Sequence, residues 1–214
     1  MSSNNPQITT ADASDNLRND KDEVLEANRE TSIYLQSDWE FVLSAIEQTP
    51  HLMQFVPEEF QTSKDFVMDA VLINSTAYAY ASDSMRNDKD IALFTVELDG
   101  RMLEHVPEHM RADKEVVLAA VKNDGFALMH ASENLRADRD VVLMAVTDKS
   151  SMLGFASAEL RNDMKVVLEA VMTWGVALEF ASAELRNDRE ASQMIAKLCS
   201  LHRTSFAQTR MSFW

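Results

Sequence analysis

The sequence predicts an all-α protein in which tandem helical repeats stack into an α-solenoid. One bulky apolar residue recurs at a step of 25, and an aspartate opens each unit at the same step. Only four glycines and four prolines among 214 residues leave little room for long loops. Self-similarity at a fixed short period is the mark of a repeat architecture. The recurring residues are Leu35, Phe60, Met85, Met110, Leu135, Leu160 and Leu185, and Asp38, Asp88, Asp113, Asp138, Asp163 and Asp188, with Ser63 in the one exceptional place.

The period divides the chain into four parts. Residues 1–16 are rich in Ser, Asn, Thr and Asp and are expected to be a disordered leader. Residues 17–37 are expected to be a shortened N-terminal capping repeat, since terminal repeats are commonly atypical. Residues 188–214 are expected to form a C-terminal capping helix and tail. Between them, residues 38–187 hold six full repeats: 38–62, 63–87, 88–112, 113–137, 138–162 and 163–187.

Each unit is expected to contain two short helices and a 3₁₀ turn. The opening Asp is suited to cap the first helix, which continues through an apolar run such as 116–121. Gly100, Gly125 and Gly175 follow this helix, where a left-handed C-cap favours glycine. A second, shorter helix covers the stretch around 127–131. A serine or proline then marks a turn in which no backbone N–H is required, and a short 3₁₀ turn carries the packed leucine.

The repeating letters resemble a known family. Residues 113–121 (DKEVVLAAV) and the Ala-Ser-x-x-Leu-Arg-x-Asp joints at 131–138 and 156–163 are similar to those of short tandem helical repeats catalogued as a domain of unknown function. The similarity covers residues 38–187 well and 17–37 loosely. The resemblance implies a helical repeat surface without assigned chemistry, and it provides no catalytic residue.

Charge and cysteine usage narrow the class of partner. The chain has 35 acidic and 20 basic residues, a net charge of −15, whereas nucleic acids and anionic membranes bind basic faces. The single Cys199 cannot form an internal disulfide and suits a reducing compartment. The first residues hold no apolar run typical of a signal peptide, and nothing later would span a bilayer. We therefore expect a cytoplasmic protein that binds neither nucleic acid nor membrane.

One motif could carry metal chemistry. His105, Glu108 and His109 match the H-x-x-E-H pattern of zinc peptidases, which need both histidines on one helical face. Pro107 lies between them, and His105 occupies a recurring aromatic position of the unit. We interpret the match as variation within the repeat, and we expect no catalytic residue, no cofactor and no metal site.

Charged residues recur at two further positions. D-x-D pairs such as Asp138 and Asp140 lack the glycine and distal glutamate of a calcium loop, and helix capping explains their first member. One arginine per unit could bind an acidic or phosphorylated peptide. The alternative, which the acidic excess favours, is that each arginine pairs with an Asp or Glu of its own or the adjacent unit. These arginines are Arg86, Arg111, Arg136, Arg161 and Arg186.

Positions that do not repeat are the candidates for partner binding. They lie in the first helix and the loop after it, where one unit has Asp or Lys and another has a large apolar side chain. Such positions are expected to face solvent, where large apolar groups can mark a binding patch. The alternative is that they pack against an adjacent loop. The candidate residues are Phe94, Phe126, Met144, Met172 and Trp174.

The predicted function is a non-enzymatic helical-repeat module that binds a protein or peptide. A metal-dependent hydrolase that uses the H-x-x-E-H residues is one alternative. An architectural spacer without a partner is the other.

Overall fold

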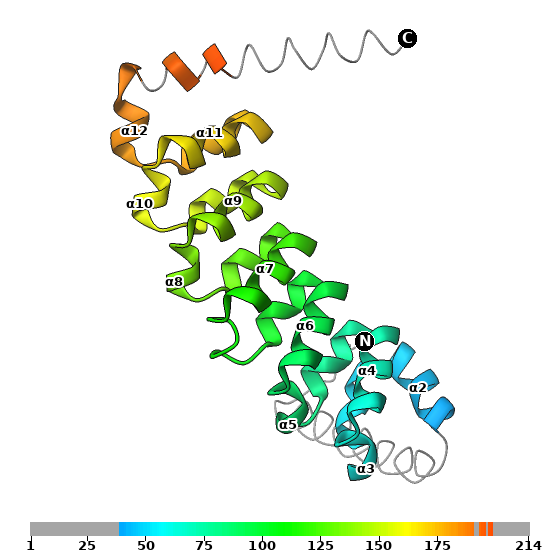
Figure 1. Ribbon diagram of the computed structural model, residues 1–214. Coiled ribbons are helices and arrows are strands. Elements are labelled where there is room, and N and C mark those ends of the chain that lie inside the picture. The colour runs from blue at the N-terminus through cyan, green and yellow to red at the C-terminus, as the bar shows by residue number, and fades with distance from the viewer. Residues whose placement is uncertain (1–38, 191–192, 196, 199–214) are drawn as a thin grey trace, which may run out of the picture.

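The computed structural model describes residues 39–190, 193–195 and 197–198 of the chain. The described residues form an elongated stack of helices from α2 at one end to α12 near the other (Figure 1), and none of them lies in a strand. The predicted all-α solenoid is therefore confirmed. The expected leader, the shortened repeat, Asp38 and residues 199–214 lie outside the described residues. None of the described helices is both long enough and apolar enough to cross a lipid bilayer.

Each full repeat contains a ten-residue α-helix, a six-residue 3₁₀ helix and a short α-helix of four or five residues. The third unit differs, because residues 108–112 form a turn in place of the short helix. The long helices are α2 (Trp39–Gln48), α4 (Lys64–Ile73), α6 (Lys89–Leu98), α7 (Lys114–Asn123), α9 (Arg139–Asp148) and α11 (Met164–Thr173). The 3₁₀ helices are η1 (Pro50–Phe55), η2 (Ser75–Tyr80), η3 (Gly100–His105), η4 (Gly125–His130), η5 (Ser150–Phe155) and η6 (Gly175–Phe180). The short helices are α3 (Glu58–Gln61), α5 (Asp83–Arg86), α8 (Glu133–Arg136), α10 (Ala158–Arg161) and α12 (Ala183–Asn187).

The 3₁₀ segment lies earlier in the unit than the sequence predicted. The N–H of Ala127 donates to the carbonyl of Asp124, three residues back, whereas the N–H of Arg136 donates to that of Ser132, four residues back. The segment after the serine is therefore α-helical, and the segment before it is 3₁₀. A 3₁₀ helix rises about 2.0 Å per residue, so six residues span nearly the length of ten α-helical residues at about 1.5 Å each. The two layers of the stack thus have similar lengths.

Wherever the opening residue of a unit is described, it caps the helix that it begins, as predicted. The carboxylate of Asp113 accepts hydrogen bonds from the N–H groups of Glu115 (2.9 Å) and Val116 (3.5 Å). These bonds satisfy amides that have no partner inside the helix. Equivalent bonds are accepted by Ser63, Asp88, Asp138, Asp163 and Asp188.

The glycines after the long helices are not the left-handed C-caps that the sequence predicted. No described residue has a positive φ, and the residue that ends α7 is extended, with φ −143° and ψ 117°. Gly100 and Gly125 instead begin the 3₁₀ helices, where the next unit comes close. A Cβ on Gly100 would overlap the carbonyl oxygen of Ala120, and one on Gly125 would lie 2.8 Å from that of Ala145. Close packing between units, rather than backbone conformation, therefore requires glycine at these two positions.

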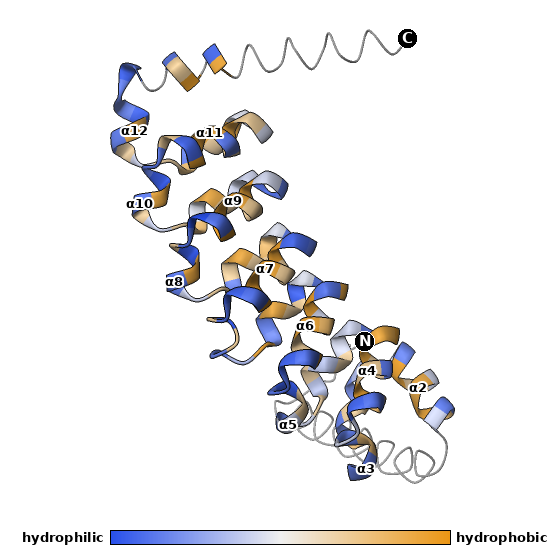
Figure 2. Cartoon of the chain, viewed as in Figure 1, coloured by the Kyte–Doolittle hydropathy of each residue, from blue (hydrophilic) through white to orange (hydrophobic). Residues whose placement is uncertain are grey.

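The buried side chains form one continuous core between the long helices and the 3₁₀ helices. In the fourth unit the buried apolar residues of these two helices are Val116, Val117, Ala120, Val121, Ala127 and Leu128. Figure 2 shows hydrophobic residues concentrated along the stacked helices, while the short helices are mainly hydrophilic. Because the core is shared between neighbours, each unit is stabilised mainly by the units beside it.

A backbone hydrogen bond joins successive units at the serine before the short helix. The N–H of Ser132 donates to the carbonyl of Arg111 at 2.9 Å. The same bond runs from Ser157 to Arg136 and from Ser182 to Arg161. The sequence predicted that this position requires no N–H, because proline also occurs there. That prediction is wrong for these three units.

The third unit has Pro107 at the serine position and cannot donate an N–H to Arg86 of the preceding unit. The hydroxyl of Tyr78 donates to the carbonyl of Arg86 instead, at 2.8 Å. The other described units have methionine or leucine in the place of Tyr78. Its side chain is fully buried, and burial raises the pKa of the hydroxyl well above its usual value. Tyr78 thus supplies the donor that proline lacks.

A second contact between units joins the N-termini of the long helices. The ammonium of Lys89 lies 2.7 Å from the Asp113 carboxylate and 2.8 Å from that of Glu115 in the next unit. The hydrogen bond from Lys89 lowers the pKa of Asp113, and the hydrogen bonds to Asp113 and Glu115 raise the pKa of Lys89. Lys64 bridges Asp88 and Asp90, Lys114 bridges Asp138 and Asp140, and Arg139 lies 3.6 Å from Asp163. The D-x-D pairs therefore hold a lysine of the preceding unit.

A third contact links the end of one long helix to the preceding unit. The side-chain oxygen of Asn123 accepts from the N–H of Gly100 at 2.8 Å, and its amide donates to the carbonyl of Glu97 at 2.8 Å. Asp148 accepts from the N–H of Gly125 at 2.9 Å one unit later. Several polar residues that occupy the same position in successive units therefore form contacts that join one unit to the next.

Candidate interaction surfaces

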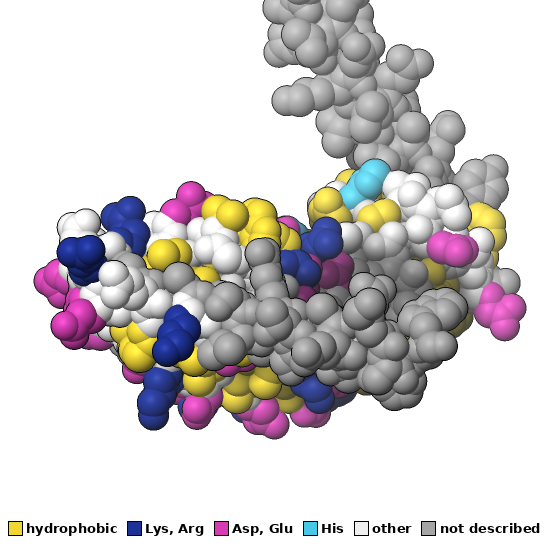
Figure 3. All heavy atoms as spheres, turned by 90° about the horizontal axis from the view of Figure 1, so that it is seen from above, with side chains coloured by type: hydrophobic (Ala, Val, Ile, Leu, Met, Phe, Trp, Pro, Cys, Tyr) yellow, Lys and Arg dark blue, Asp and Glu magenta, His cyan; other side chains and the backbone are white. Residues whose placement is uncertain are grey.

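Three of the five candidate partner-binding residues are exposed. Phe126 on η4 is 40% exposed, Met144 on α9 is 42% exposed, and Trp174, which follows α11, is 58% exposed. They belong to the fourth, fifth and sixth units, so a partner that contacted all three would lie along the stack. On the face seen in Figure 3, hydrophobic side chains form small patches among charged ones.

The other two candidates are half-buried, which corrects the expectation that they face solvent. Phe94 packs against the core, whereas Met144, at the equivalent position two units later, is exposed. Phe94 follows the buried Ile91 by three residues and therefore lies at the edge of the buried stripe of α6. Met172 on α11 is also only partly accessible. A surface built from the candidates consequently centres on the exposed three.

Phe126 lines a shallow pocket of about 380 Å³ on the 3₁₀ layer. The ammonium of Lys149 lies 5.6 Å from the centre of its ring, within cation–π range. Burial lowers the pKa of His130 in this pocket, opposed by the charge of Glu104, so the imidazole is neutral near pH 7. The lining residues are Arg101, Glu104, Phe126, Met129 and His130.

The H-x-x-E-H residues do not share a helix. His105 ends η3, Val106 is extended with φ −72° and ψ 137°, and Pro107 precedes the turn that holds Glu108 and His109. The two histidines therefore lack the common helical face that the zinc-peptidase pattern needs. Over the described ranges, no three His, Cys, Asp or Glu side chains are grouped so that they could hold a metal ion.

Of the arginines that recur once per unit, Arg86 pairs as predicted and three others do not. Arg86 forms an ion pair with Asp83 of its own short helix. Within the described part of the chain, Arg111, Arg136 and Arg161 form no ion pair with a carboxylate. The buried Nε atoms of Arg86, Arg111 and Arg161 also have no hydrogen-bond partner there. The charges of Arg111, Arg136 and Arg161 are therefore not neutralised as expected. Many acids of the stack lie instead at the starts of the long helices, where they bind lysines.

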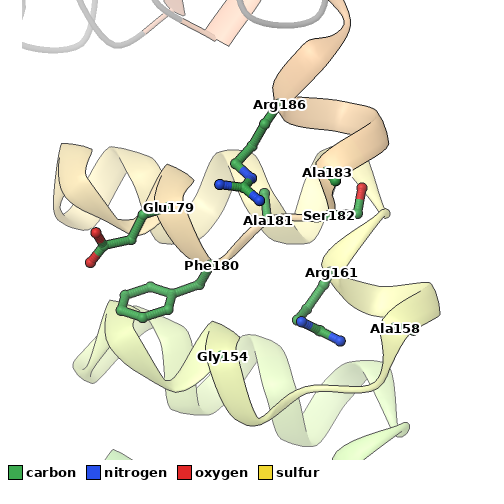
Figure 4. Close-up of a pocket in the computed structure, with 9 residues that line it drawn as sticks. All are labelled: Gly154, Ala158, Arg161, Glu179, Phe180, Ala181, Ser182, Ala183 and Arg186. Atoms are coloured by element: carbon green, nitrogen blue, oxygen red, sulfur yellow. The ribbon is translucent and has the colours of Figure 1, made fainter.

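Two of these arginines line a pocket of about 460 Å³ between the fifth and sixth units. Figure 4 shows the side chains of Arg161 and Arg186, from α10 and α12, near Phe180 and above Gly154. Glu179 is its acidic lining residue. Two guanidinium groups beside an aromatic ring can accept an anionic group by charge-assisted hydrogen bonds. The sequence contained one signal for this pocket, the recurrence of the arginine.

The fold and these surfaces define the class of protein: an α-solenoid of tandem repeats that carries apolar and cationic groups on its surface. The family model described as "Domain of unknown function (DUF4116)" matches residues 38–85, 63–111 and 113–161. The matches cover more than half of the chain, so the chain belongs to this family. Each match spans about two of the 25-residue units, which confirms the resemblance seen in the repeats. No curated protein and no solved structure matches the chain.

Proposed function

We propose that the chain is a non-enzymatic, cytoplasmic module that binds a protein or peptide partner along its helical stack. The observation that carries the proposal is the exposure of Phe126, Met144 and Trp174 at positions that do not repeat. Exposed aromatic and methionine side chains are enriched at protein interfaces. Many of the recurring positions are already used for packing, capping and contacts between units.

The proposal is tested on the triple variant Phe126→Gln, Met144→Gln, Trp174→Gln. A partner is first identified by cross-linking in cytosol and then purified, so that its Kd for each variant can be measured. Buried aromatic anchors contribute about 2 kcal/mol or more to binding, so we expect the triple variant to bind at least about thirtyfold more weakly. Its far-ultraviolet circular dichroism should match that of the unchanged chain.

Phe41→Gln is the control, because Phe41 is exposed by 53% but occupies a recurring apolar position at the first described unit. This variant should bind like the unchanged chain. A triple variant that keeps its helix content and its affinity would overturn the proposal for this surface. If no protein is cross-linked at all, the architectural spacer becomes the better interpretation.

A further inference from the structure

We infer that the recurring arginines form a docking groove for an extended acidic segment of a partner protein, with one carboxylate held per repeat. The inference rests on the proposed function, since it names the chemistry of a partner that such a module would bind. The arginine groove is defined here as the surface between the 3₁₀ layer and the short helices. It follows the recurring arginines Arg111, Arg136, Arg161 and Arg186 along the stack, and in the last two units Arg161, Arg186 and Phe180 line one pocket.

The charge state of the groove differs from that of the rest of the stack. The lysines Lys64, Lys89 and Lys114 each hold two carboxylates of the next unit. Arg111, Arg136 and Arg161 hold none in the described part of the chain, although the chain has 35 acidic residues against 20 basic ones. A guanidinium presents donors in a planar fork that matches a carboxylate. An acidic ligand would supply the partner that these groups lack.

The fifth and sixth units have no acid three residues before their arginine, because Ala158 and Ala183 occupy that position. Asp83 at this position forms an ion pair with Arg86, whereas Glu108 and Glu133 form none with Arg111 and Arg136 in the described part of the chain. Both alanines line the pocket of Figure 4.

The pocket also presents an aromatic ring beside the arginines. Gly154 packs closely against Phe180, since a Cβ on Gly154 would come within 3.1 Å of that ring. Phe155, at the equivalent position one unit earlier, is 39% exposed. Grooves lined by aromatic rings are typical sites for proline-rich segments in the polyproline II conformation.

The spacing of the repeats selects the same conformation. Packed helices lie roughly 8–10 Å apart, so successive arginines are separated by about that distance. A polyproline II segment makes one turn in three residues and advances about 9 Å per turn. An acid at every third residue of such a segment would therefore meet one arginine in each unit. An α-helical segment advances about 5.4 Å per turn, so acids on its successive turns would not each meet an arginine.

The test compares two peptides of equal composition on the full-length chain, by fluorescence anisotropy at low ionic strength. One peptide has four Glu-Pro-Pro triplets, and the other has its four glutamates at one end and its prolines at the other. Since a charge-assisted hydrogen bond contributes enough to change Kd by about tenfold, the spaced peptide should bind at least about tenfold more tightly. Equal affinity for both peptides would show charge attraction without register and would overturn the inference.

Two variants locate the binding. Arg136→Gln with Arg161→Gln should weaken the spaced peptide by about tenfold or more. Ala158→Glu should weaken it while leaving every arginine in place, because it adds a negative charge at the lining of the pocket that holds Arg161 and so repels an acidic peptide. The control Lys122→Gln with Lys165→Gln makes the same change in net charge at two exposed lysines of α7 and α11 and should leave Kd within about twofold.

The same measurements separate this inference from the proposed function. The triple variant of Phe126, Met144 and Trp174 should keep its affinity for the spaced peptide. If the peptide does not bind, while the surface of Phe126, Met144 and Trp174 still captures its partner, the arginine groove is refuted and the proposed function as a binding module is retained. Binding to phosphatidylserine vesicles without binding to either peptide would assign the arginines to a membrane and would equally refute the inference.

Discussion

The hydrogen bond to the carbonyl of Arg86 shows how the residue at position 78 depends on the unit that follows it. In the later units a serine N–H donates to this carbonyl position, but Pro107 has no N–H. Tyr78, eight residues before Arg86, places its hydroxyl 2.8 Å from the carbonyl oxygen. A buried carbonyl without a donor is unfavourable, because it loses its hydrogen bond to water without replacement.

Tyr78→Phe should therefore lower the free energy of unfolding by about 1 kcal/mol, since it removes the hydroxyl and keeps the ring. Urea denaturation followed by circular dichroism measures the change. Tyr80→Phe is the matched control: Tyr80 is 40% exposed, and its variant should differ from the unchanged chain by less than about 0.5 kcal/mol.

Pro107→Ser adds a sharper arm to the same experiment. The serine would restore the backbone donor, so Tyr78→Phe should cost less in the Pro107→Ser background than in the unchanged chain. Additive losses in this double-mutant cycle would mean that the two residues do not share the Arg86 carbonyl.

At the scale of the element, the 3₁₀ helix sets how closely two units approach. Its first residue packs against the end of the next long helix, so that a Cβ on Gly100 or Gly125 would meet the backbone of Ala120 or Ala145. The residue before the 3₁₀ helix is often a side-chain cap, since Asn74, Asp99 and Asp124 each accept a hydrogen bond from the second amide of the 3₁₀ helix. The element is thus fixed by its own cap on one side and by its neighbour on the other.

Gly100→Ala should destabilise the stack by about 1–3 kcal/mol, because its Cβ would overlap backbone atoms that cannot move without shifting α7. Gly175→Ala is the control, since nothing lies within 4 Å of the position of its Cβ. The control should lose no stability and can gain up to about 1 kcal/mol, because alanine restricts the unfolded chain. Thermal unfolding of both variants measures the difference, and equal losses would show that the close approach is not the reason for glycine.

At the scale of the whole molecule, the contacts between units are nearly interchangeable. A lysine at the start of one long helix meets the acids of the next, and an Asn or Asp at the end of a long helix meets the preceding unit. Since each unit contacts only its neighbours, the stability of the stack is close to a sum of units and interfaces.

Deletion of residues 113–137 should therefore leave a shorter, folded stack. Lys89 would then face Asp138, the N–H of Gly100 would face Asp148, and the carbonyl of Arg111 would face Ser157. We expect the helix content per residue to stay unchanged and the urea midpoint to fall, as measured by circular dichroism. Deletion of residues 113–124, about half a unit, is the control. It removes the register of all three contacts, so a shorter stack equally stable in both deletions would contradict the modular interpretation.

The amino-acid sequence by itself determined the repeat, the helix caps, the all-α solenoid and the family. Each depends on residues close together in the chain or on the period itself: Asp113 caps the helix that it begins, and Val116 and Val117 point into the core of their own unit. Local hydrogen bonds and helical periodicity act over three or four residues, so a linear reading can recover them.

Only the tertiary structure decided which side chains of the repeat are exposed and which form contacts with other residues. Phe94 and Met144 share a position in the unit, yet the first packs against the core and the second is exposed. The carbonyl of Arg86 accepts a hydrogen bond from a tyrosine hydroxyl, and the guanidinium of Arg161 has no carboxylate partner in the described part of the chain. These outcomes depend on contacts between residues up to about one repeat apart. The packing of neighbouring segments brings such residues together or keeps them apart, and no local sequence pattern specifies that packing.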